Sequence, residues 1–268
     1  MTTRIGLFRA GFDSFLDNLH FRLNQENRVW TAASVFGVVA NYAMYAVAWR
    51  FLGQEASVFL NYFLIGYVVT SMGGVGRDFI SYACLQSKDI MRHLLPTGRS
   101  RLPMYTWALL ISAFDAAWAS GIIVLISLGL GSAIVVPVNS LLAVGLAIAS
   151  YAMFQAVVEM ALMMIILRSS GMGAVAATLF SLVSNFISGM YFPIEEFRKV
   201  SDALYSFANV YPGHLLLSVA RDAISVPVDP VVLMIMVLTI PLGVVLILRF
   251  LEFYWGYVVE YDLWEERM

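Results

Sequence analysis

Six long apolar segments constrain this 268-residue chain more than any other feature of its sequence. A helix needs about 20 residues to cross the roughly 30 Å of hydrocarbon in a bilayer, and each segment approaches or exceeds that length. Hydrophobic residues make up 60% of the chain, which is more apolar surface than one water-soluble core of this size buries. We therefore predict an all-α, multi-pass protein of the cell membrane, with residues 1–268 forming a single transmembrane domain. The expected spans are residues 29–49, 57–76, 104–130, 137–167, 172–190 and 229–249.

Basic residues predict the orientation of these spans, because Lys and Arg gather in cytoplasmic loops. If the N-terminus is cytoplasmic, twelve of the sixteen basic residues fall on the inner side. Both termini and the loop 77–103 are then expected inside the cell, and the segment 188–225 is expected outside. The four basic residues left on the outer side are Arg50, Arg198, Lys199 and Arg221.

Charge and motif content argue against several functions. The formal net charge of −2 gives no broad basic face, so no nucleic-acid partner is expected. Neither lysine, Lys88 or Lys199, follows a Gly-rich phosphate-binding motif, so we expect no ATPase site in this chain. The three histidines fall in separate regions and cannot share a metal under this topology, so neither a metal nor a catalytic site is predicted.

Two polar regions on the predicted inner side have helical patterns. Residues 4–27, within the N-terminal stretch 1–28, form an amphipathic helix that either lies flat at the interface or packs against the bundle. In the loop 77–103, residues 85–95 read as a short helix that ends at Pro96 and Gly98. This helix is either a docking surface for a cytoplasmic partner or an anchor at anionic headgroups.

Polar residues inside the apolar segments are the internal site candidates. A carboxylate near the bilayer centre costs at least about 2.5–3.5 kcal/mol, so Asp115 and Glu159 should face protein or water. Either they line a substrate path or they form hydrogen bonds between helices. The fifth span carries a stripe of small and polar residues, including Ser181, Asn185 and Ser188, which suits a helix contact or a polar lining. Aromatic residues near span ends, among them Tyr254 and Trp255, are expected at the membrane interfaces.

The segment 188–225 mixes apolar and charged residues in a way that suits neither a free loop nor a spanning helix. Short helices that dip into the outer leaflet and turn back would fit, because backbone at membrane depth must be satisfied by protein or a wet cavity. An ordinary interfacial hairpin is the alternative. A Ser-Gly pair, an aromatic pair with Pro, and a downstream Asn, Pro and Arg stand out; they are Ser188, Gly189, Tyr191, Phe192, Pro193, Asn209, Pro212 and Arg221.

This pattern and the six segments resemble an ABC-2 type transporter permease, although N-V-Y-P stands here where that family commonly has adjacent Asn-Pro. The resemblance implies an amphipathic N-terminal interfacial helix and a re-entrant outer segment that closes the translocation path. It also implies a cytoplasmic coupling helix seated on a separate ATP-binding cassette subunit. The coupling residues would be Leu85, Lys88, Asp89, Met91, Arg92, His93 and Leu94.

By the same resemblance, two permease chains, identical or paralogous, would assemble with two ATP-binding subunits. ATP and Mg would be bound by those subunits, and membrane lipid would surround the permeases. The substrate would be an amphiphilic or bulky molecule such as a drug, peptide, lipid or glycan, and it would be exported. The residues themselves leave two other functions open. One is an ion-gradient-driven carrier that uses Asp115 and Glu159, and the other is a membrane scaffold or sensor.

Overall fold

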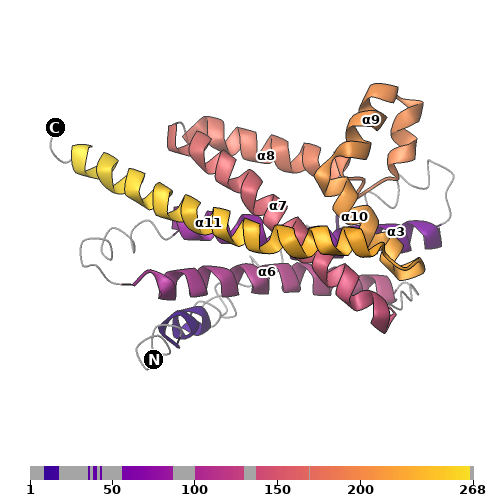
Figure 1. The fold of residues 1–268 in the computed structure, drawn as a ribbon, viewed down its shortest axis with the longest axis horizontal. Helices are drawn as coiled ribbons and strands as arrows, with labels where there is room; N and C mark the ends of the chain where they lie inside the picture. Colours follow the sequence, from indigo (N-terminus) through magenta and orange to yellow (C-terminus); the bar gives the residue numbers. More distant parts are fainter. Residues whose placement is uncertain are drawn as a thin grey trace.

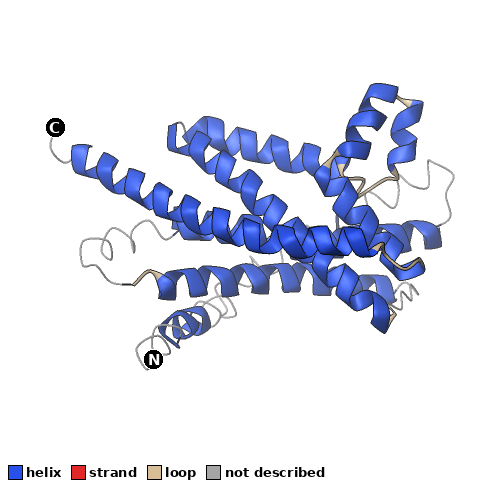
Figure 2. Ribbon diagram, in the orientation of Figure 1, coloured by secondary structure: helices blue, strands red, loops and turns tan. Residues whose placement is uncertain are grey.

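The computed structural model contains only helices and connecting turns in the part that it describes, with no strand (Figure 2). This confirms the all-α prediction. Three of its helices are long and apolar enough to cross a membrane: α6 (Leu102–Gly129), α7 (Leu141–Arg168) and α11 (Pro230–Glu265). The described residues are 9–17, 36, 39, 40, 43, 56–86, 100–129, 137–168 and 170–265.

The remaining described helices are shorter and lie beside these three. Helices α6, α8 and α11 run roughly along the long axis of the molecule, and α7 crosses it obliquely (Figure 1). Helix α9 stands at one end, whereas residues 9–17 and the C-terminal end of α11 lie towards the other. The shorter elements are α3 (Ala56–Gly73), α4 (Val75–Ser81), a π-helix (Tyr82–Gln86), the 3-10 helix η4 (Val138–Ser140), α8 (Ser170–Ile187), the 3-10 helix η5 (Ile194–Lys199), α9 (Asp202–Val210) and α10 (Pro212–Ser225).

Several helix limits differ from the predicted spans. Helical structure in the second segment continues through α4 and the π-helix to Gln86, ten residues beyond the expected end at residue 76. The third, fourth and fifth segments match α6, α7 and α8 to within a few residues. The first predicted segment lies almost entirely outside the described residues.

Helix α11 departs furthest from its prediction, because it continues 16 residues past the expected end at residue 249 to Glu265. Arg249 does not end the helix, since its Nη1 atom pairs with the Glu252 carboxylate one turn later at 3.2 Å. Tyr254 and Trp255, which were expected at a membrane interface, are buried within the bundle in the same hydrophobic cluster as Cys84 and Met104. At about 1.5 Å per residue, the 36 residues of α11 extend about 54 Å, well beyond the thickness of the hydrocarbon.

Helix α7 is the centre of the packing, because it contacts α3, α4, α8, α10 and α11. Glycines allow the first two of these helices to lie directly on it. A Cβ atom at Gly73 would overlap the Tyr151 ring, and one at Gly76 would overlap the backbone carbonyl of Ala152. Small residues that let helix backbones approach closely are the usual means of helix association in lipid.

Residues 9–17 form a helical segment that packs against α6. Gly11 lies against Pro103, and the Phe15 and Phe114 rings are 6.3 Å apart. Phe12 and Leu16 on the same segment are exposed. For these residues the structure shows contact with the bundle and leaves an apolar face outward, so the two interpretations of the N-terminal helix are compatible.

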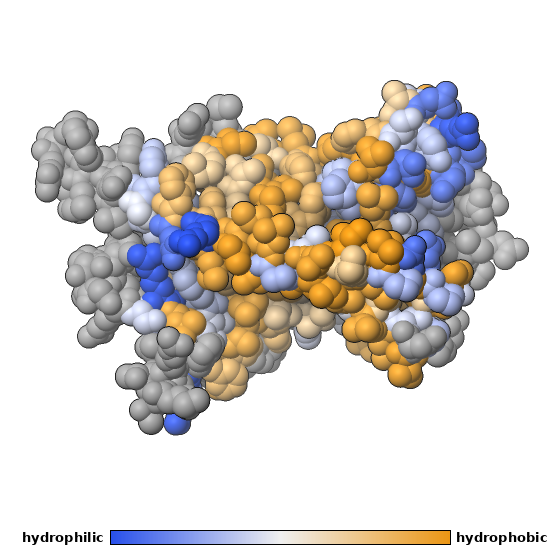
Figure 3. All heavy atoms as spheres, viewed as in Figure 1, coloured by the Kyte–Doolittle hydropathy of each residue, from blue (hydrophilic) through white to orange (hydrophobic). Residues whose placement is uncertain are grey.

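One face of the bundle is apolar across its middle. Figure 3 shows hydrophobic residues over the central part of this face and hydrophilic residues towards its two ends. Helices α8 and α11 carry exposed apolar residues, such as Leu182, Phe186, Leu238 and Val245. An apolar belt with polar ends is typical of a protein that crosses a bilayer.

Replacing Gly76 tests the close contact between α4 and α7. We expect Gly76→Ala to lower the free energy of unfolding by about 1–3 kcal/mol, because the new methyl group meets the Ala152 backbone, which cannot move aside. Gly121→Ala is the matched control, since no atom lies within 4 Å of its added Cβ and alanine favours a helix. Thermal unfolding of the purified variants in detergent measures the difference, and equal stability of the two would contradict the packing described here.

Candidate functional site

The segment 188–225 folds as a series of short helices that turns back on the bundle. After α8, a turn leads to η5, then to α9 and α10. The Ser201 hydroxyl caps α9 by accepting a hydrogen bond from the Leu204 amide at 3.4 Å. Within the sequence N-V-Y-P, Tyr211 has an extended backbone between two helices, and Pro212 occupies the first turn of α10, where its missing amide hydrogen costs nothing. Of the two residues that separate Asn from Pro here, Val210 is therefore the last residue of α9, and Tyr211 forms the corner between α9 and α10.

The turn after α8 depends on Gly189. Its φ angle is +73°, in the left-handed region that side chains other than glycine rarely adopt. Its carbonyl oxygen accepts hydrogen bonds from the Tyr62 hydroxyl at 2.9 Å and from Arg221 Nη2 at 3.0 Å. The turn is thereby joined to α3 and α10, two elements far from it in sequence.

Arg221 holds the centre of this arrangement. Its Nη2 atom also lies 3.3 Å from the carbonyl oxygens of Tyr62 and Met190, and the guanidinium carbon lies 3.5 Å from the centre of the Tyr62 ring. Gly66 leaves space for the guanidinium, because a Cβ there would lie 2.6 Å from Nη2. Desolvation lowers the pKa of Arg221 to about 10, so the side chain is charged at neutral pH. We call Arg221, Tyr62 and Gly189 the arginine clasp.

A second contact joins α10 to the end of α8. His214 Nδ1 lies 3.2 Å from the Ser188 carbonyl oxygen, to which it can donate as a neutral ring. Burial lowers the pKa of His214 below its ordinary value and favours this neutral form. Gly213 brings the start of α10 close to Ser188, and Leu217 packs in the core with Tyr151 of α7.

A polar cavity of about 190 Å³ lies beside this end of α8, between α3, α4, α7 and α8. The predicted polar residues Ser181 and Asn185 both line it. Ser184, which also lines the cavity, is within 2.6 Å of the Tyr211 hydroxyl, so the corner of the outer segment is bonded to the cavity wall. A cavity of this polarity has room and partners for ordered water or a small polar group. Its lining residues are Tyr67, Thr70, Ser71, Gly74, Arg77, Gln155, Ser181, Ser184, Asn185, Met190 and Tyr191.

Sequence patterns did not single out Arg77 and Gln155, two further residues that line this cavity. Arg77 was expected in an inner loop, but it lies on α4, where its Nε atom pairs with Asp78 at 2.9 Å. Gln155 is the one amide side chain within the fourth predicted span, apart from Asn139 near its start, and that rarity was the available signal.

The two carboxylates within the predicted spans do not line this cavity. Glu159 is buried and accepts a hydrogen bond from the Ser81 hydroxyl at 2.8 Å, and Asp115 accepts one from the Tyr82 hydroxyl at 2.6 Å. The two donors are consecutive residues at the junction of α4 with the π-helix. Both bonds join separate helices, which is one of the two roles that the sequence left open.

The other predicted site residues occupy varied positions. Phe192 packs beside Phe63, whose ring is 6.2 Å from that of Tyr191, and Pro193 precedes η5. Asn209 and Pro212 are exposed. Leu85 is an exposed residue of the π-helix, and the remaining predicted coupling residues, Lys88, Asp89, Met91, Arg92, His93 and Leu94, lie outside the described residues.

Comparisons with protein-family models, with curated proteins and with solved structures found no significant match. The resemblance to ABC-2 permeases therefore stays a prediction from the sequence.

Truncating Arg221 tests the arginine clasp. We expect Arg221→Met to lower the free energy of unfolding by about 2 kcal/mol, because charge-assisted hydrogen bonds to three carbonyl groups are lost. Arg221→Lys should recover only part of the loss, since an ammonium lacks the planar fork. The control is Arg198→Met, which removes an arginine that is 71% exposed and should change stability by less than about 0.5 kcal/mol. Thermal unfolding in detergent distinguishes the variants, and equal effects at the two arginines would contradict a structural role for the clasp.

Proposed function

We propose that the chain is the transmembrane permease subunit of an ABC-2 type exporter that moves an amphiphilic or bulky substrate and is powered by a separate ATP-binding subunit. The proposal includes six spans, both termini in the cytoplasm, and a path formed between two permease chains. The observation that carries it is the folded 188–225 segment, which turns back onto α3, α7 and α8 beside a polar cavity.

The arginine clasp and the polar cavity suggest how the outer end of the path would open. Opening the outer end of a path beside the cavity would require the 188–225 segment to move, and that movement would break contacts made by Arg221 and Tyr211. Each contact is a small number of hydrogen bonds, so an outward-open state is within reach of the free energy of ATP hydrolysis. The clasp would then hold the gate closed between transport cycles.

At the inner end of the proposed path, the π-helix is the candidate element for transmitting movement from the ATP-binding subunit. The predicted coupling helix, residues 85–95, begins within the π-helix, and just before it Ser81 and Tyr82 form hydrogen bonds to α7 and α6. A displacement of the coupling helix by a partner ATPase would therefore act on two long helices at once. π-Helical turns are often found at functional sites, and this one follows directly on α4.

Co-purification and reconstitution test this function. The chain is expressed together with candidate ATP-binding subunits from its genomic neighbourhood and reconstituted in vesicles. We expect a stable complex and accumulation of an amphiphilic dye that requires hydrolysable ATP, with a partner subunit inactivated in its phosphate-binding lysine as the control. Absence of any associated ATPase together with ATP-independent transport would refute the proposal.

Neutralising the carboxylates separates this function from an ion-gradient carrier. Because Asp115 and Glu159 accept hydrogen bonds from hydroxyl groups, we expect Asp115→Asn and Glu159→Gln to retain these bonds and to retain ATP-dependent transport in the reconstituted complex. A carrier that uses both carboxylates for proton coupling would instead lose its transport. The measurement is dye uptake with ATP alone compared with uptake driven by an imposed pH gradient.

A further inference from the structure

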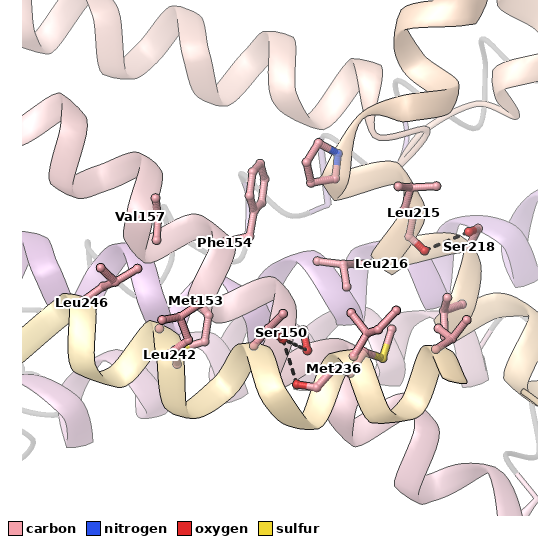
Figure 4. Close-up of a pocket in the computed structure, with 16 residues that line it drawn as sticks. Ser150, Met153, Phe154, Val157, Leu215, Leu216, Ser218, Met236, Leu242 and Leu246 are labelled. Carbon is pink, nitrogen blue, oxygen red and sulfur yellow. Dashed lines mark hydrogen bonds between the residues drawn. The ribbon is translucent and has the colours of Figure 1, made fainter. Parts of the chain in front are cut away.

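A large apolar groove lies on the far side of α10 from the arginine clasp, between α7, α10 and α11 (Figure 4). Its volume is about 550 Å³, within the range of about 300–1,000 Å³ that is usual for ligand sites. Met153, Phe154 and Val157 form the wall from α7, while Leu242 and Leu246 lie along α11. Leu215 and Leu216 of α10 complete it.

The few hydroxyl groups in the groove are already hydrogen-bonded within the protein. Ser150 and Thr239 lie 3.3 Å apart across α7 and α11, and Thr239 also donates to the Met236 carbonyl oxygen. Ser218 donates to the Leu215 carbonyl oxygen. No lining residue is charged, so the groove offers neither a charge nor an unsatisfied polar group to an occupant. Its occupant must therefore be apolar along its buried length.

The position of the groove identifies where such an occupant comes from. Two of its three walls, α7 and α11, are among the helices long and apolar enough to cross a membrane. Its lining residues Leu242, Leu246 and Val157 are exposed, as are the neighbouring apolar residues Leu238 and Val245 of α11. The groove therefore opens sideways into the region that lipid chains fill.

We propose that this groove binds one acyl chain of a membrane phospholipid and that the bound chain braces α10 against α7 and α11. An acyl chain suits the site because it is apolar along its whole length, as the uncharged lining requires, and the groove lies beside the contact between α7 and α11. Gly243 marks that contact, since a Cβ there would lie 2.7 Å from the Met153 sulfur. The inference requires α7 and α11 to lie in a membrane but does not depend on an ATPase partner.

Retention of lipid by filled-groove variants tests the inference. Native mass spectrometry of the purified chain after extensive detergent washing should find one phospholipid per chain in the wild type. Leu242→Trp fills the groove and should lose at least 90% of this lipid. Leu238→Trp is the matched control, because Leu238 lies one turn earlier on α11, is exposed to the same extent (61% against 60%) and does not line the groove. The control should retain the lipid.

A second pair on α7 protects the result against a folding artefact. Val157→Trp should release the lipid and Ile165→Trp should not, since only Val157 lines the groove and the two residues are similarly exposed. Adding back a phospholipid with two 16-carbon chains should raise the unfolding temperature of the wild type and controls by at least 3 °C more than that of the filled variants. Equal lipid retention by filled and control variants would overturn the inference, as would disulfide capture of Leu242→Cys by a second copy of the chain.

Discussion

Backbone groups outside helices must find partners within the protein when the surroundings are apolar, and the turn from Ser188 to Pro193 finds them in side chains of α3 and α10. The turn ends α8 and therefore leaves carbonyl groups without helical partners. Arg221, Tyr62 and His214 supply donors to three consecutive carbonyl groups there. Two of these donors, Arg221 and His214, belong to α10. The hydrogen bonds that satisfy the carbonyl groups of the turn therefore also hold α10, and with it the outer segment, against the bundle.

Close helix contact at α7 makes that arrangement possible. Helices α3 and α4 can reach both the turn and the carboxylates only because Gly73 and Gly76 let their backbone lie on α7. On the opposite side, Gly243 brings α11 to Met153 of the same helix. Packing of small residues replaces the hydrophobic driving force that lipid removes. The spaces left beside these close contacts are the polar cavity on one side and the apolar groove on the other.

Much of the helical framework could be predicted from the sequence, because long apolar runs leave the backbone few alternatives in a membrane. The end of α11 could not, since Arg249 reads as the end of a span until its partner Glu252 is placed one turn away. Asp115 and Glu159 were expected to face protein, and Tyr82 and Ser81 do donate hydrogen bonds to them. The π-helix that begins at Tyr82 could not be predicted, because no periodicity in the sequence indicates it. Gly189 and Arg221 stood out as residues, whereas their shared partner Tyr62 is more than 120 positions away and carries no local signal.

The α3–α4 unit links the two regions on which the proposed mechanism depends. Tyr62 belongs to the arginine clasp, and Tyr82, twenty residues later, donates a hydrogen bond to Asp115 of α6. At about 1.5 Å per residue this separation is about 30 Å, which matches the thickness of the hydrocarbon. Helical structure is nearly continuous between the two tyrosines, interrupted only by the turn at Gly74, whose amide still bonds to Thr70 at 2.9 Å. A displacement at the π-helix would therefore reach the clasp through one stiff element, with Gly74 as the place where it could bend, and no chain of loosely packed side chains is needed to connect the two ends.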